Sequence, residues 1–175
     1  MFYEAERLER EHVSNAAAKL CAAARTAPKA KGVDTIRTAF VSGEDRFALA
    51  DEVERIGREH DAAFFLRDAE CIRKADGVAL IGTGAKPRGI SPCGLCGFAD
   101  CAGCRKANGR CALAITDLGI AVGSAVSIAA DDRVDNRVFF TAGVAAVNLG
   151  LLGEEVRIAY GIPLSVGGKS IFFDR

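Results

Sequence analysis

Clustered cysteines constrain what this chain can become more than any other feature of its sequence. The chain has seven cysteines, and five of them fall within positions 93–111: Cys93, Cys96, Cys101, Cys104 and Cys111. An odd count argues against a framework of disulfides and favours metal or redox chemistry in a reducing compartment. The first residues are charged and contain no apolar signal region, so we expect the protein to be cytoplasmic.

The spacing of these cysteines is typical of a metal centre. Two Cys-x2-Cys steps begin at Cys93 and Cys101, and Gly94 and Gly97 allow the loop to wrap around a bound group. An iron–sulfur cluster needs four thiolates, so one of the five is spare. Zinc held by both steps is the alternative, although only residues 97–100 separate them, whereas zinc ribbons usually place about a dozen or more residues there. Reactive thiols without metal are the third interpretation.

Apolar periodicity and turn signals predict a single domain, residues 1–175, in which helices and strands alternate. The expected helices cover residues 3–26, 68–75, 111–130 and 136–149, and a further helix is expected to begin after Ser42, which would cap it. The expected strands cover residues 35–41, 77–82 and 155–160. We expect Gly161-Ile162-Pro163 to end the last strand and residues 83–110 to form a loop. The class is therefore α/β or α+β.

The helix expected at 111–130 carries a single charged residue, Asp117. Its length could span a membrane, but no aromatic belt or Lys/Arg asymmetry flanks it, so we expect a buried core helix and no membrane partner. Gly119 and Gly123 stand four residues apart, which allows another backbone to approach closely. Small residues occur on more than one side of this helix. We therefore expect a homodimer, in which a second copy covers one side.

Balanced charge excludes one class of partner. Lys plus Arg and Asp plus Glu each total 23, which argues against a strongly basic nucleic-acid binder. Cations nevertheless gather around the cysteines: Lys86, Arg88, Arg105, Lys106 and Arg110. They form either a solvated loop or a positive surface that docks a redox partner protein near a net-negative cluster.

A second group of cations, Arg25, Lys29 and Lys31, follows the end of the first expected helix. These charges either complement the dipole at the C-terminus of that helix or bind the phosphate of a cofactor. In the second interpretation Lys169, from the Gly-rich tail, joins them. Residues 167–170 match only the last part of a phosphate-binding loop, and no helix is expected after them.

The run Cys93-Gly94-x-Cys96-Gly97-x3-Cys101, followed by Cys111, resembles the four-cysteine iron–sulfur motif of several bacterial and archaeal redox proteins. This resemblance implies a 4Fe–4S cluster held by Cys93, Cys96, Cys101 and Cys111, with Cys104 as the spare. Nearly the whole chain also resembles a prokaryotic family described as carrying a ferredoxin domain, through residues 25–32, 65–70, 116–119, 130–131, 133–137, 159–165 and 168–170. The description of that family names a motif and no activity.

The order of the expected elements is similar to that of FMN-dependent nitroreductases, which are intertwined homodimers with flavin at the dimer interface. This second resemblance implies an α+β protein, a nitroreductase-like α/β sandwich with a cysteine-rich metal-binding insertion at about residues 83–111. FMN would then lie near Arg25, Lys29, Lys31 and Lys169. In those enzymes Ser and Asn follow the Ala-Pro turn, whereas this chain has Lys29 and Gly32 at about those places.

These patterns together predict an iron–sulfur electron-transfer protein, with a flavin-dependent oxidoreductase as its enzymatic form. In that form the cluster would carry single electrons and a flavin would convert them to two-electron chemistry. The alternative is a non-catalytic binding module in which zinc folds the cysteine-rich segment. The sequence contains no hydrolase triad or nucleophile-elbow motif, which leaves redox chemistry as the favoured class.

Overall fold

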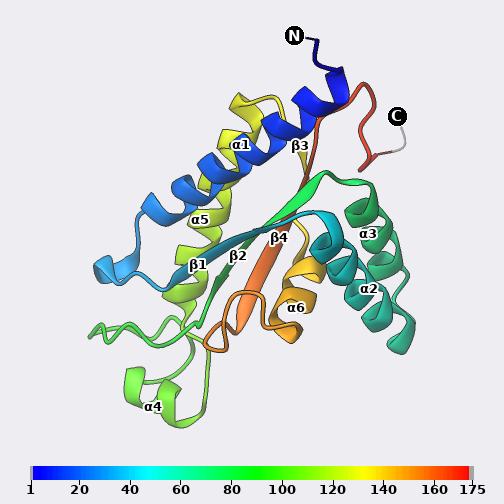
Figure 1. Ribbon diagram of the computed structural model, residues 1–175. Helices are drawn as coiled ribbons and strands as arrows, with labels where there is room; N and C mark the ends of the chain where they lie inside the picture. Colours follow the sequence, from blue (N-terminus) through cyan, green and yellow to red (C-terminus); the bar gives the residue numbers. More distant parts are fainter. Residues whose placement is uncertain (1, 174–175) are drawn as a thin grey trace.

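The computed structural model describes residues 2–173 (Figure 1). At its centre is an antiparallel sheet with the strand order β1-β2-β4-β3. The strands are β1 (Ile36–Val41), β2 (Gly77–Thr83), β3 (Asp135–Asn136) and β4 (Ile158–Ser165). Every residue of β2 is buried, because β1 and β4 flank this strand and helices cover both of its faces.

Helices form a layer on each face of the sheet (Figure 1). One layer contains α1 (Ala5–Thr26) and α5 (Ala112–Asp131), and the other contains α2 (Gly43–Glu59), α3 (Ala63–Lys74) and α6 (Phe140–Asn148). The short helices are η1 (Ala30–Gly32) and α4 (Cys101–Lys106). Successive β2 side chains alternate between the two cores: Val78 and Leu80 join α2, α3 and α6, while Ala79 and Ile81 join α1 and α5. The prediction of a mixed α/β fold is confirmed.

The long apolar helix α5 is a core helix in this fold. It is long and apolar enough to cross a membrane, but Leu118, Ala121 and Ala125 are buried among residues of α1 and the sheet. The hydroxyl of Ser124 donates to the carbonyl oxygen of Ala23 at 3.2 Å, which joins α5 directly to α1. Small side chains at the contact allow the two helices to lie close together.

The last strand is longer than the sequence predicts, because Gly161-Ile162-Pro163 does not end it. Gly161 exchanges backbone hydrogen bonds of 2.8 and 2.9 Å with Phe139, on the side of β4 away from β2. On the opposite side, the carbonyl of Leu164 accepts the N–H of Asp76 at 2.9 Å. Since strand residues alternate, Pro163 faces the same way as Gly161, and its missing N–H removes no bond to β2.

Two helix starts and one helix cap differ from prediction. The helix expected from Asn136 begins at Phe140, because Asp135 and Asn136 pair with β4 as strand β3. The helix expected at 68–75 begins earlier, at Ala63. Ser42 stands at the expected N-cap of α2, but its side chain makes no capping hydrogen bond. Secondary-structure patterns therefore located these elements better than they located their ends.

Candidate metal centre

All five clustered cysteines lie in the connection between β2 and α5, residues 84–111, which we call the cysteine loop. The loop leaves the sheet where β2 ends and lies at one end of the molecule (Figure 1). It contains the short helix α4, which sequence reasoning missed. Asp100 begins this helix by accepting the N–H of Gly103 at 2.7 Å, and an aspartate at that position is a readable capping signal.

Two of the clustered cysteines are firmly packed. Cys104 has no exposed surface, and Cys111, at the N-cap of α5, is 6% exposed. The N–H of Cys111 donates to the carbonyl of Ala85 at 2.9 Å, and the N–H of Gly109 donates to the carbonyl of Cys104 at 2.8 Å. A Cβ on Gly109 would lie 2.7 Å from the ring of Phe98 and 3.1 Å from the Cys104 sulfur, so this position requires glycine. Phe98 and Gly109 thus enclose Cys104.

Electrostatic interactions link four of the five thiols. Burial raises the pKa of the Cys104 thiol above its usual value, and a side-chain interaction with Cys96 raises it further. The charges of Cys96, Cys111 and Cys101 act in the same direction. Cys96, Cys101 and Cys111 therefore lie near Cys104.

Cys93 stands apart from this group, on an exposed turn. It borders a shallow surface cavity together with Ile90, Pro92, Gly94, Leu95 and Leu113. The N–H of Gly97 donates to the carbonyl of Gly94 at 2.9 Å, which closes the turn, and the side chain of Leu95 is 70% exposed. The cysteine loop therefore has a turn that carries the half-buried Cys93 and Cys96, and a packed part that carries the buried Cys104 and Cys111.

The chemistry of these donors fits an iron–sulfur cluster, because five soft thiols occur in one loop. Their present arrangement is not closed around a metal. Within residues 2–173, no three Cys, His, Asp or Glu side chains lie close enough together to hold one metal ion. To gather four sulfurs, the exposed turn would have to close over the packed part of the loop. The cysteine-rich metal-binding insertion stays a prediction.

A buried ion pair fastens the cysteine loop to α5. Nη2 of Arg88 lies 2.7 Å from Oδ2 of Asp117, and the two side chains are 2% and 4% exposed. Oδ1 of Asp117 accepts the N–H of Ala30 at 2.8 Å, and Arg88 donates to the hydroxyl of Thr35 at 3.0 Å. Thr35 shares a further hydrogen bond of 2.9 Å with Thr83. One polar network therefore joins η1, the ends of β1 and β2, the cysteine loop and α5.

Sequence analysis grouped Arg88 with the cations around the cysteines, as part of either a solvated loop or a docking surface. The structure removes it from both, since its guanidinium is buried against Asp117. A signal for such a pair was present, because Asp117 is the single charge in a long apolar segment and a buried carboxylate needs a cationic partner. The identity of that partner could not be read, because Arg88 lies 29 positions away.

Three of the cations predicted to bind a cofactor lie together, where α1 ends and η1 follows. Nη2 of Arg25 donates to Asp34 at 2.6 Å, and Nζ of Lys31 donates to the carbonyl of Gly89 at 3.3 Å. Nζ of Lys29 donates to two carbonyls at the end of α1, at 2.5 and 2.7 Å. The contacts of Lys29 complement the C-terminal end of α1, which is one of the two interpretations of this cluster, whereas Arg25 and Lys31 contact other segments.

The fourth cation, Lys169, lies elsewhere in the chain. It borders a surface cavity beside α3, together with Arg67, Glu70 and Lys74. Helix α3, which borders this cavity, and the end of α1 lie on opposite sides of the molecule (Figure 1). Within one chain the structure therefore does not bring Lys169 to Arg25, Lys29 and Lys31.

Solved structures with the same fold share little sequence with this chain. An FMN-dependent nitroreductase from Clostridium difficile R20291 is 14% identical with a TM-score of 0.56, and the match covers 97% of this chain and 80% of that one. A BluB-like flavoprotein from Clostridium difficile 630 is 16% identical with a TM-score of 0.56, over 89% of this chain and 81% of that one. These likenesses establish a nitroreductase-like fold.

Two closer sequence relationships were found, one to the C-terminal part of the chain and one to nearly all of it. The family model described as "Uncharacterized protein containing a ferredoxin domain (DUF2148)" matches residues 107–175, a range that includes Cys111 and excludes the other four clustered cysteines. An uncharacterized protein from Archaeoglobus fulgidus is 40% identical over 174 residues, which cover 94% of this chain and 92% of that protein. On this similarity the chain belongs to the family of uncharacterized proteins that contain a ferredoxin domain.

Proposed function

We propose that this protein is a cytoplasmic electron-transfer protein whose cysteine loop holds an iron–sulfur cluster of the 4Fe–4S type. The observation that carries the proposal is the occurrence of five free thiols in one short loop, in which Cys96, Cys101 and Cys111 lie near Cys104. The ferredoxin domain named in the family description supports the same chemistry. When bound, such a cluster accepts and releases single electrons.

The proposed ligands are Cys93, Cys96, Cys101 and Cys111, with Cys104 as a neighbouring thiol. Packing supports this choice, because Phe98 and Gly109 enclose Cys104, whereas Cys93 lies on the exposed turn. A thiol on an exposed turn can move toward a metal at less cost than one closed in by its neighbours. The Arg88–Asp117 pair would hold the base of the loop on α5 while the turn closes.

A flavin is the second cofactor in this proposal, and it would bind between two copies of the chain. Support comes from the fold, since the solved neighbours include a protein described as an FMN-dependent nitroreductase. Lys169 lies far from Arg25, Lys29 and Lys31 in one chain, so a flavin that contacts both groups needs a second copy. A bound flavin supplies two-electron chemistry, which gives the oxidoreductase form of the function.

Anaerobic purification with metal and sulfide analysis tests the proposal. We expect about four iron and about four acid-labile sulfide per chain, as a 4Fe–4S cluster requires. The Cys96→Ala variant should lose this iron, and Cys71→Ala should keep it, because Cys71 lies in α3 outside the cysteine loop. Stoichiometric zinc without iron, under the same conditions, would instead support the non-catalytic zinc module.

A further inference from the structure

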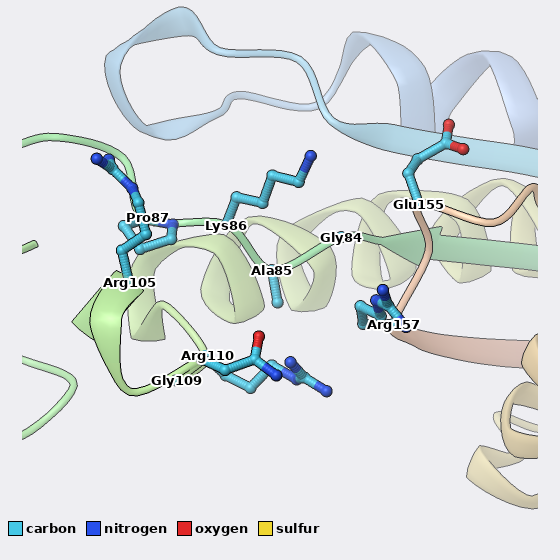
Figure 2. A pocket seen from close by; sticks show the side chains of 10 residues that line it. Gly84, Ala85, Lys86, Pro87, Arg105, Gly109, Arg110, Glu155 and Arg157 are labelled. Carbon is cyan, nitrogen blue, oxygen red and sulfur yellow. The ribbon is translucent and has the colours of Figure 1, made fainter. Parts of the chain in front are cut away.

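A cavity of about 500 Å³ lies beside the cysteine loop. Three segments that are distant in sequence form its walls: the stretch after β2, the connection from α4 to α5, and the turn before β4 (Figure 2). Its lining residues are Gly84, Ala85, Lys86, Pro87, Arg105, Asn108, Gly109, Arg110, Glu155 and Arg157. A volume of this size falls within the range of small-molecule sites.

Positive charge dominates the lining of this cavity. Lys86, Arg105, Arg110 and Arg157 line it, from all three walls, against a single carboxylate, Glu155. In Figure 2 the side chains of Arg110 and Arg157 lie close to each other, and those of Lys86 and Arg105 extend to the other side. That carboxylate already has a partner, since Oε1 of Glu155 lies 2.9 Å from Nε of Arg37 on β1. Within residues 2–173, no carboxylate forms an ion pair with the three lining arginines. Positive and negative residues are equal in number over the whole chain. The excess of positive residues in the lining is therefore local to this cavity.

Backbone contacts hold the walls in place. The N–H of Arg157 donates to the carbonyl of Thr83 at 3.0 Å, and the N–H of Cys111 donates to the carbonyl of Ala85 at 2.9 Å. A Cβ on Gly84 would lie 2.7 Å from the carbonyl oxygen of Glu155, so two of the walls touch at this glycine. The cavity is therefore set by the main chain, and its cations project from fixed positions.

We propose that this cavity binds a small anion that carries phosphate groups. The guanidinium groups of Arg110 and Arg157 offer paired N–H donors that match the oxygens of a phosphate, and Arg105 and Lys86 add positive charge at the rim. Because Arg105 and Arg110 flank the segment between Cys104 and Cys111, the bound anion would lie against the packed part of the cysteine loop. The site is independent of which metal the loop holds.

Calorimetric titration of the anaerobically purified full chain with pyrophosphate tests the proposal. We expect a dissociation constant below about 1 mM that rises with salt concentration. Arg110→Gln and Arg157→Gln should each weaken binding about tenfold or more, because each removes charge-assisted hydrogen bonds. Both side chains are exposed, so thermal unfolding should show the variants folded.

Lys106→Gln is the matched control. Lys106 is an exposed cation of α4 that does not line the cavity, and its loss should change the affinity by less than about twofold. Equal weakening by all three variants would overturn the proposal, since it would indicate unspecific attraction.

Two other ligands complete the test. Binding of citrate without pyrophosphate would assign the cavity to carboxylates, and binding of a polyglutamate peptide alone would assign this surface to an acidic partner protein; both results reject a phosphate site.

Discussion

The ion pair between Arg88 and Asp117 fastens the cysteine loop to α5, and its loss would destabilise the fold. We predict that Asp117→Leu lowers the free energy of unfolding by about 3–5 kcal/mol, because Arg88 would remain buried without a counter-charge. Urea denaturation followed by circular dichroism measures this change. Asp132→Ala, which removes the more exposed pair with Lys19, should cost no more than about 1 kcal/mol.

A double variant separates the charge from the packing. Arg88→Met combined with Asp117→Leu leaves no unpaired buried charge, so we expect it to recover most of the stability lost in Asp117→Leu. If the double variant were as unstable as the single one, the loss would come from packing or from the unpaired N–H of Ala30. The pair would then not be the contact that stabilises the base of the loop.

The identity of the spare cysteine is a second question that single residues answer. We predict that Cys93→Ala abolishes cluster assembly and that Cys104→Ala keeps most of the iron, because Cys104 is enclosed by Phe98 and Gly109. Iron per chain and the visible absorption of the anaerobic protein are the measurements. The opposite result, with iron lost in Cys104→Ala and kept in Cys93→Ala, would make Cys104 a ligand together with its neighbours Cys96, Cys101 and Cys111.

Among the elements, α5 has a face that its own chain leaves open. Ile115 and Ile120 are 37% and 41% exposed, and Gly119 and Gly123 lie on the same uncovered side. A Cβ added to either glycine meets nothing within 4 Å in the single chain. Glycine weakens a helix relative to alanine, so its presence here is explained if a second backbone approaches this face. We propose this face as the interface of the homodimer.

Replacing both glycines tests that interface. In a single chain, Gly119→Ala with Gly123→Ala should raise stability by about 1–2 kcal/mol through helix propensity. At an interface the same change should weaken the dimer, because the added methyl groups separate the helices. Analytical ultracentrifugation at low micromolar concentration measures the dissociation constant. Ser14→Ala, on an exposed position of α1, is the control and should leave the dimer dissociation constant unchanged. An unchanged dissociation constant in the glycine variant would show that the dimer forms through another surface.

Over the whole molecule, a sheet covered on both faces supports chemistry at one of its ends. Two hydrophobic cores hold β2 between the helix layers, and the cysteine loop, η1 and the turn before β4 meet beyond one end of that strand (Figure 1). Placing reactive residues in loops on a rigid scaffold is a common arrangement in proteins. Here it brings five thiols and a basic cavity together, so an anion and a cluster would occupy neighbouring sites.

Local chemistry was readable from the sequence. Apolar periodicity located α1, α5 and β2. An apolar stripe along a helix, or an apolar run in a strand, involves residues that are close in sequence and can therefore be recognised there. Cysteine spacing indicated thiol chemistry for the same reason, since the five residues lie within one short segment. The mixed α/β class follows from these local patterns taken together, whereas the family assignment rests on similarity to a relative along nearly the whole chain.

Contacts between distant segments were not readable in the same way. Pro163 continues β4 because its ring nitrogen faces away from β2, and that orientation depends on the register between strands. Arg88 is buried because Asp117 meets it across the loop, and Arg157 joins Arg110 at a cavity because β4 begins beside the end of β2. Each of these outcomes depends on which backbones pack together. Burial and charge pairing depend on which residues meet in three dimensions, and local sequence patterns do not reveal those neighbours.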